Sequence, residues 1–122
     1  MPKVGDLVGL SVDVSGNERK QKATHTAAGA ISIKNGTAMI GSGGALAMTL
    51  ARPLAGEDDG KELVITAITA FAHTVTNTTP GFNKAGAAGD VATFGGAIGD
   101  SMRIIAANGV WNAVSLRNVT LG

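Results

Sequence analysis

The chain has 122 residues, a length typical of one compact domain, and 44% of them are hydrophobic while only 16% are charged. A formal net charge of +1 gives no strong field toward nucleic acid or an anionic membrane, and an aromatic content of 3% disfavours a base-stacking platform or an aromatic ligand pocket. The absence of cysteine excludes a disulfide framework and a thiolate nucleophile, and near-neutrality favours association between copies.

The N-terminal part is predicted to be an arm and linker over residues 1–29. Val8, Leu10, Val12 and Val14 alternate with small or polar residues, which is the period of a half-buried strand. The segment over 15–29 is too long for a hairpin turn and too weakly apolar to pack. The strand is expected either to return to its own sheet or to add to an exposed sheet edge of a neighbour.

No targeting or membrane-spanning segment is predicted. The first residues lack the uninterrupted apolar core of a signal peptide, and no 18 apolar residues run together. We therefore expect the protein to be made and kept in a cytoplasm.

From Ala30 onward, strand signals alternate with turn signals. Ile31 and Ile33, followed by the turn dipeptide Asn35-Gly36 and a run over 37–40, predict a hairpin. A third strand is predicted over 45–50.

An acidic turn over 55–60 precedes a run over 63–69 that is apolar on both faces, and this pattern predicts a central strand. Two further strands are predicted over 70–77 and 91–94. The loop over 79–89 between them is rich in glycine, which disfavours a helix.

The last predicted element is a hairpin that pairs 102–107 with 110–116 across Asn108-Gly109. Strands recur at roughly ten-residue spacing with Gly, Asn and Asp turns between them, a pattern typical of a sandwich or barrel. The predicted fold is all-β, a small antiparallel β-sandwich or barrel-like domain over 30–122.

Few residues are candidates for chemistry. His25 and His73 have no carboxylate or second imidazole at ligand spacing, so we interpret both as structural or surface residues. The acidic cluster over 57–59 lacks the alternating oxygen ligands of a calcium loop, and Ser42 lacks the strand-to-helix context of a nucleophile. Trp111, the single tryptophan, is interpreted as an anchor of the core or of a subunit contact. We expect no catalytic residue, metal site or cofactor, and no enzyme activity.

The second half of the chain carries a succession of turn and core motifs. They are LARPLAGEDDGK (50–61), LVIT (63–66), AHTV (72–75), GFN (81–83), ATFGG (92–96), GDS (99–101) and NGVW (108–111). Over about residues 45–116, this succession resembles small β-rich structural proteins of tailed bacteriophages, in particular head decoration (cement) proteins. Related modules occur in phage fibre and tail proteins.

The resemblance implies a β domain that forms a homotrimer and caps three-fold and quasi-three-fold positions of an expanded icosahedral shell. It implies the major capsid protein and the chain itself as partners, on the outer surface of the virion head. From the low net charge we expect no nucleic acid and no membrane as partners. The alternative is a tail or fibre component that adheres to a host surface.

In many proteins of this kind an N-terminal segment reaches onto the capsid. The features of this sequence that match such an arm by position and character are Val8, Leu10, Val12 and Val14, with Arg19, Lys20 and Lys22 beyond them.

Overall fold

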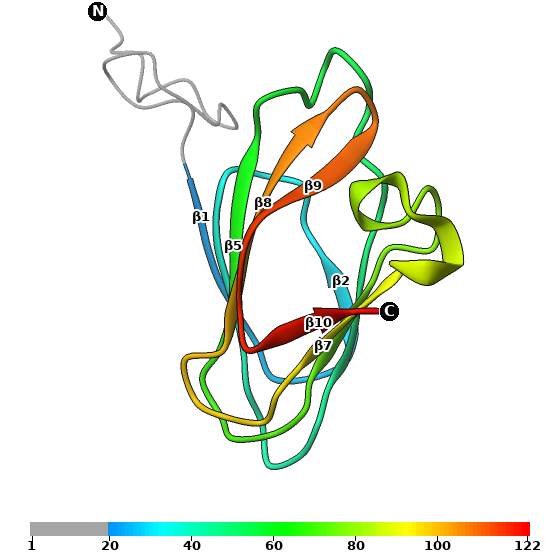
Figure 1. Cartoon of the computed structure of the whole chain (residues 1–122). Coiled ribbons are helices and arrows are strands. Elements are labelled where there is room, and N and C mark those ends of the chain that lie inside the picture. The colour runs from blue at the N-terminus through cyan, green and yellow to red at the C-terminus, as the bar shows by residue number, and fades with distance from the viewer. Residues whose placement is uncertain (1–19) are drawn as a thin grey trace, which may run out of the picture.

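The computed structural model describes residues 20–122, which form a sandwich of two five-stranded sheets (Figure 1). The first sheet has the order β1 (Gln21–His25), β3 (Gly36–Ile40), β5 (Glu62–Ala67), β8 (Ser101–Ala107) and β9 (Val110–Arg117). The second has the order β10 (Val119–Leu121), β7 (Val91–Phe94), β6 (Thr74–Thr76), β4 (Ala47–Leu50) and β2 (Gly29–Ile31). The all-β prediction is confirmed. The strand expected over 8–14, and Arg19, lie outside the described residues.

The chain alternates between the two sheets along its first six strands. β1, β3 and β5 pair in parallel in the first sheet, and β2, β4 and β6 pair in parallel in the second. Two antiparallel pairings complete each sheet. Both sheets are therefore mixed, whereas the sequence pattern predicts antiparallel sheets. Each connection between parallel neighbours passes through a strand of the opposite sheet.

The hairpin predicted around Asn35-Gly36 does not form. β2 pairs with β4 in one sheet, while β3 pairs with β1 and β5 in the other. Gly36 has φ 127°, and a Cβ atom there would overlap the backbone carbonyl of Gln21. The glycine is therefore required by the close approach of β1 as well as by its own backbone conformation.

The sandwich begins earlier than the predicted boundary at Ala30, because part of the expected linker forms β1. This strand brings little apolar surface and is held by backbone pairing, in register from Gln21 opposite Gly36 to His25 opposite Ile40. The side-chain amide of Gln21 also donates to the carbonyls of Ser32 (2.9 Å) and Lys34 (3.1 Å).

The core lies between the sheets and is built from alternate residues of the strands. β5 occupies the middle of the first sheet, as predicted for the run over 63–69, and buries Leu63, Ile65 and Ala67. Trp111 on β9 is fully buried in the same core, and its Nε1 donates to the carbonyl of Ala51 at 2.9 Å. The indole therefore joins the last hairpin to the segment that follows β4.

The loop over 79–89 contains two single turns of 3₁₀ helix, η2 (Phe82–Lys84) and η3 (Gly86–Ala88). Phe82 is fully buried, and Oδ1 of Asn83 accepts a hydrogen bond from the backbone N–H of Ala113 on β9 (2.8 Å). The loop thus covers part of the outer edge of β9.

The other strands agree with the sequence predictions to different degrees. β7 and the β8–β9 hairpin lie where they were expected, β6 covers only part of the run over 70–77, and β10 is not predicted by the sequence pattern.

Candidate functional site

The two histidines serve different structural roles. His73 is fully buried; its Nδ1 accepts a hydrogen bond from the backbone N–H of Leu46 (2.9 Å), and its Nε2 lies 3.0 Å from Oγ1 of Thr69. Because Nδ1 accepts, this arrangement requires a proton on Nε2, which donates to Thr69. His25 lies on the edge strand β1, and its Nε2 is buried without a hydrogen-bond partner among the described residues.

No metal site is present in the part of the chain that the structure describes: residues 20–122 contain no group of three or more His, Cys, Asp or Glu that could hold an ion. Ser42 makes only a local turn, with its Oγ donating to the carbonyl of Gly44 (3.0 Å) and accepting from the backbone N–H of Gly44 (3.3 Å). The Ser42 hydroxyl is thus bonded to the backbone of Gly44 and not to a basic side chain.

The acidic turn expected to be solvated contains a buried carboxylate. Asp58 is only 6% exposed; it pairs with Nζ of Lys61 at 2.7 Å and accepts from the backbone N–H of Leu54 at 2.7 Å. The Lys61 hydrogen bond, followed by that from Leu54, lowers the pKa of the Asp58 carboxyl. Asp59 accepts from the backbone N–H of Asn108 at 2.7 Å, so both aspartates hold loops together.

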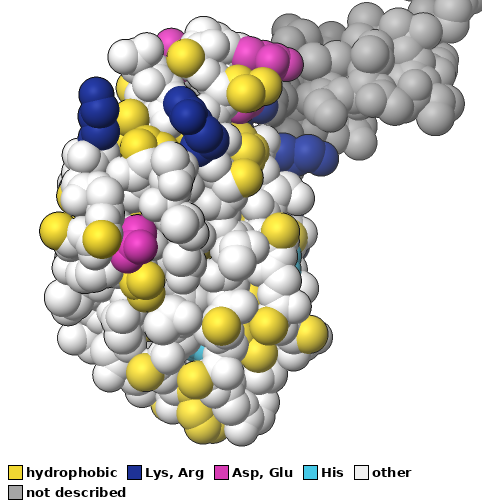
Figure 2. Space-filling view, turned by 90° about the vertical axis from the view of Figure 1, so that its right-hand side faces the viewer, with side chains coloured by type: hydrophobic (Ala, Val, Ile, Leu, Met, Phe, Trp, Pro, Cys, Tyr) yellow, Lys and Arg dark blue, Asp and Glu magenta, His cyan; other side chains and the backbone are white. Residues whose placement is uncertain are grey.

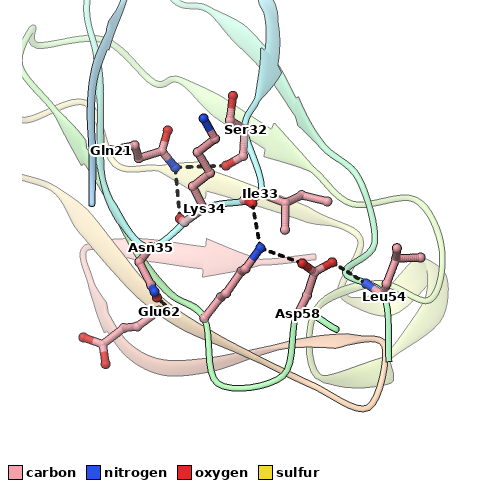
Figure 3. A network of polar contacts seen from close by, with 9 residues as sticks. Gln21, Ser32, Ile33, Lys34, Asn35, Leu54, Asp58 and Glu62 are labelled. Carbon is pink, nitrogen blue, oxygen red and sulfur yellow. Dashed lines mark hydrogen bonds and ion pairs between the residues drawn. The ribbon is translucent and has the colours of Figure 1, made fainter. Parts of the chain in front are cut away.

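These contacts continue to the start of β1 (Figure 3). Lys61 Nζ lies 3.5 Å from the carbonyl of Ile33, and Oδ1 of Asn35 accepts from the backbone N–H of Glu62 at 2.7 Å. Gln21 closes the network through its two bonds to the β2–β3 connection. The network fixes the point at which the predicted arm joins the sandwich, next to the exposed Lys20.

Three loops, over 41–46, 68–73 and 95–100, lie at the opposite end of the sandwich, at the bottom of Figure 1. Backbone hydrogen bonds join them to neighbouring strand ends: Gly99 N–H to Ala67 O (2.9 Å), Ala67 N–H to Asp100 O (2.8 Å) and Ile68 N–H to Ile40 O (2.9 Å). We call these three loops the apolar end.

Three large hydrophobic side chains are exposed at the apolar end: Ile68 (40%), Phe71 (38%) and Ile98 (71%). The three loops contain no Lys, Arg or Glu, and their one carboxylate, Asp100, is buried. On the face drawn in Figure 2, the blue and magenta side chains lie away from the lower end, where yellow ones gather. An exposed apolar surface without charge is typical of a docking surface.

Buried polar groups hold these loops in place. His73 and Thr69 link the loop over 68–73 to that over 41–46, because Oγ1 of Thr69 also accepts from the backbone N–H of Ser42 at 3.3 Å. Asp100 fixes the third loop by accepting from the backbone N–H of Ala97 at 2.9 Å.

The carboxylate of Asp100 also joins this loop to the β9–β10 corner. Both of its oxygens lie 3.1 Å from Nδ2 of Asn118. The Ala97 hydrogen bond, assisted by that from Asn118, lowers the pKa of the Asp100 carboxyl despite its burial. Ile98 is therefore presented on a turn that is closed by the bond from Ala97 to the buried carboxylate of Asp100 and is tied through that carboxylate to Asn118.

A hollow of about 370 Å³ lies at the ends of the parallel strands of the second sheet. It is lined by Ala30, Ile31, Thr49, Leu50, Ala51, Arg52, Thr76, Asn77, Thr78 and Thr79. The amide of Asn77 is engaged with the carbonyl of Leu50 (2.8 Å) and the backbone N–H of Gly81 (3.1 Å). The walls offer hydroxyls and one guanidinium but no carboxylate or imidazole, so they supply neither a general acid–base pair nor a cluster of metal ligands.

The residues singled out from the sequence do not form one site. Trp111 lies in the core without exposed surface, Lys20 and Lys22 are exposed near and on β1, and the other proposed arm residues lie outside the described part. The sequence reasoning did not identify the apolar end. The features of the sequence that indicate this surface are the absence of charge from three separate loops and the position of Ile98 between glycine turns.

The described part of the chain has no helix long and apolar enough to span a membrane. The chain matches no family model, no curated protein and no solved structure.

Proposed function

We propose that this protein is a non-catalytic structural component of a bacteriophage virion, which binds the outer surface of the head as a trimeric decoration protein. The observation that carries the proposal is the apolar end, where Ile68, Phe71 and Ile98 are exposed on loops without exposed charge and offer a surface for assembly with other copies. A preformed surface of this kind supports a binding role. The resemblance of residues 45–116 to decoration proteins supplies the identity of the assembly.

The polar groups support a structural role in a second way. His73, Asp58 and Asp100, which are the buried titratable side chains of the described region, are each engaged in hydrogen bonds that join loops. A general base or nucleophile needs a lone pair or proton directed at a substrate. In this sandwich the corresponding atoms are directed at the backbone and at neighbouring side chains.

The proposed mechanism is additive. Each trimer contacts several subunits of the shell, and the sum over many symmetric positions stabilises the assembled head by mass action even where a single contact is weak. The partners are the major capsid protein and further copies of this chain. The arm, with Val8, Leu10, Val12 and Val14 followed by Arg19, Lys20 and Lys22, provides the contact with the shell.

The proposal is tested by co-sedimentation of the purified protein with undecorated heads, scored as copies bound per shell. We expect saturation at three copies for each three-fold and quasi-three-fold position. A variant lacking residues 1–14 should stay folded, since both described sheets are built from residues 21–121, and should bind heads more weakly.

Failure to bind heads at high molar excess would overturn the decoration role. Binding to intact bacterial cells by the same preparation would then favour the alternative, a tail or fibre component that adheres to the host surface.

A further inference from the structure

We infer that the apolar end is the surface through which copies of this chain associate with one another. The inference deepens the proposed function, on which it rests for the number of copies, because it assigns the contacts of the trimer to named side chains. Its central residue is Ile98, which at 71% is the most exposed large hydrophobic side chain of the described region.

The absence of charge favours a second copy as the occupant. Rotational symmetry brings the same surface of each subunit together around one axis, so a charged side chain near that axis would face its own image. The loops over 41–46, 68–73 and 95–100 expose no Lys, Arg, Asp or Glu. The exposed charge beside them is Arg117, which lies opposite Ser101 on the edge strand β9. The three loops of identical subunits can therefore meet around an axis without like-charge repulsion, provided that Arg117 stays at the margin of the contact.

The rigidity of this surface lowers the entropic cost of association. Asp100 holds the turn of Ile98 through the backbone of Ala97, and His73 with Thr69 holds the loop that carries Ile68 and Phe71. The apolar side chains are thus displayed on backbone that is already fixed in one subunit.

The other exposed apolar positions are less suited to self-association. Val114 and Leu116 belong to the edge strand β9, whose pairing with β8 is interrupted by a bulge between Arg103 and Ile104. Asn83 also occupies the backbone N–H of Ala113 on that edge. A bulge and a covering loop are devices that discourage addition of a further strand.

The experiment compares Ile98→Asp with Leu54→Asp by sedimentation equilibrium over about 1–100 µM protein. Leu54 is the matched control, because it is 57% exposed, belongs to the acidic loop at the opposite end, and acquires the same charge. We expect trimers for the wild type and for Leu54→Asp, and a dissociation constant raised at least about 30-fold for Ile98→Asp. Phe71→Ser, which adds no charge, should weaken association by a smaller factor, and circular dichroism should show all three variants folded.

A wild-type protein that stays monomeric at the highest concentration would overturn the inference, as would an Ile98→Asp variant that associates as well as Leu54→Asp. The head-binding assay is scored separately. Self-association through Ile98 without any binding to heads would leave the inference standing and overturn the decoration role. A monomeric wild type whose head binding is abolished by Ile98→Asp would instead assign the apolar end to the capsid contact.

Discussion

At the scale of single residues, the buried polar side chains explain how short strands and long connections hold a defined shape. Asp100 is the clearest case, because one carboxylate serves the backbone of Ala97 and the side chain of Asn118 at once. Hydrogen bonds donated to a buried carboxylate stabilise the fold fully only while that carboxylate is ionised. The turn that presents Ile98 should therefore depend on pH.

Acidification should reveal this dependence. The pKa of Asp100 in the folded protein lies below its usual value, so its contribution to stability is complete above about pH 4 and is lost as the pH falls through the folded pKa. We expect Asp100→Asn to lower the melting temperature at pH 6 and to flatten its decline between pH 6 and pH 3. Thermal unfolding followed by circular dichroism measures both effects.

Asp58 shares the direction of this pKa change, so part of the decline should remain in the Asp100→Asn variant. Glu57→Gln, which changes an exposed carboxyl at the other end, is the control and should follow the wild type. A decline in Asp100→Asn as steep as that of the wild type would assign the acid sensitivity to other groups.

At the scale of elements, the sequence predicts a strand well where the partner is near in the chain. β7 and the hairpin of β8 and β9 were located from alternation and from the Asn108-Gly109 turn, and the apolar run over 63–69 was correctly placed at the centre of a sheet. β1 was not predicted and β2 was predicted with the wrong partner, because the true partners β3 and β4 follow only after a strand of the opposite sheet.

The candidate surface was missed for a related reason. Its three loops are separated by more than twenty residues along the chain, and only the two-sheet winding brings them to one end. Phe71 was expected inside a strand, whereas β6 begins at Thr74 and leaves the aromatic ring in a loop. Local sequence patterns do not indicate which loops lie at the same end of a sandwich.

The hydrogen bonds that join the loop before β4 to the loop before β6 should depend on His73. We expect His73→Leu to lower the free energy of unfolding by about 1–3 kcal/mol, because the backbone N–H of Leu46 loses its acceptor within the structure. Urea unfolding followed by the emission of the single tryptophan, Trp111, which is fully buried in the folded state, measures the change.

The matched control for this change is His25→Leu. Nε2 of His25 is buried without a partner in the described residues, so its removal should leave the stability unchanged or raise it. Equal losses in the two variants would show that the imidazole contributes by its volume and not by its hydrogen bonds.

At the scale of the whole molecule, charge is distributed unequally between the two ends of the sandwich. The end where the arm joins carries Lys20, the Asp58–Lys61 pair and the exposed Arg103–Glu62 pair at 2.7 Å, whereas the three loops of the apolar end expose no charge and only Arg117 lies at their edge among the described residues. In the proposed assembly, each end makes a different contact. The basic residues of the arm face the shell, and the apolar end faces other copies.

Ionic strength should separate these two contacts, because salt screens exposed charges and has little effect on apolar burial at moderate concentration. Between about 50 and 500 mM NaCl, we expect binding to heads to weaken progressively while the trimer persists in sedimentation equilibrium. Replacing Arg19, Lys20 and Lys22 with glutamine should reduce head binding at low salt and remove most of its salt dependence, without dissociating the trimer. If head binding is equally insensitive to salt in the wild type and the triple variant, the basic residues make no contact with the shell. If instead the trimer dissociates as salt rises, copies are joined by charged groups and not by Ile98 and its neighbours, and the division of roles between the two ends is wrong.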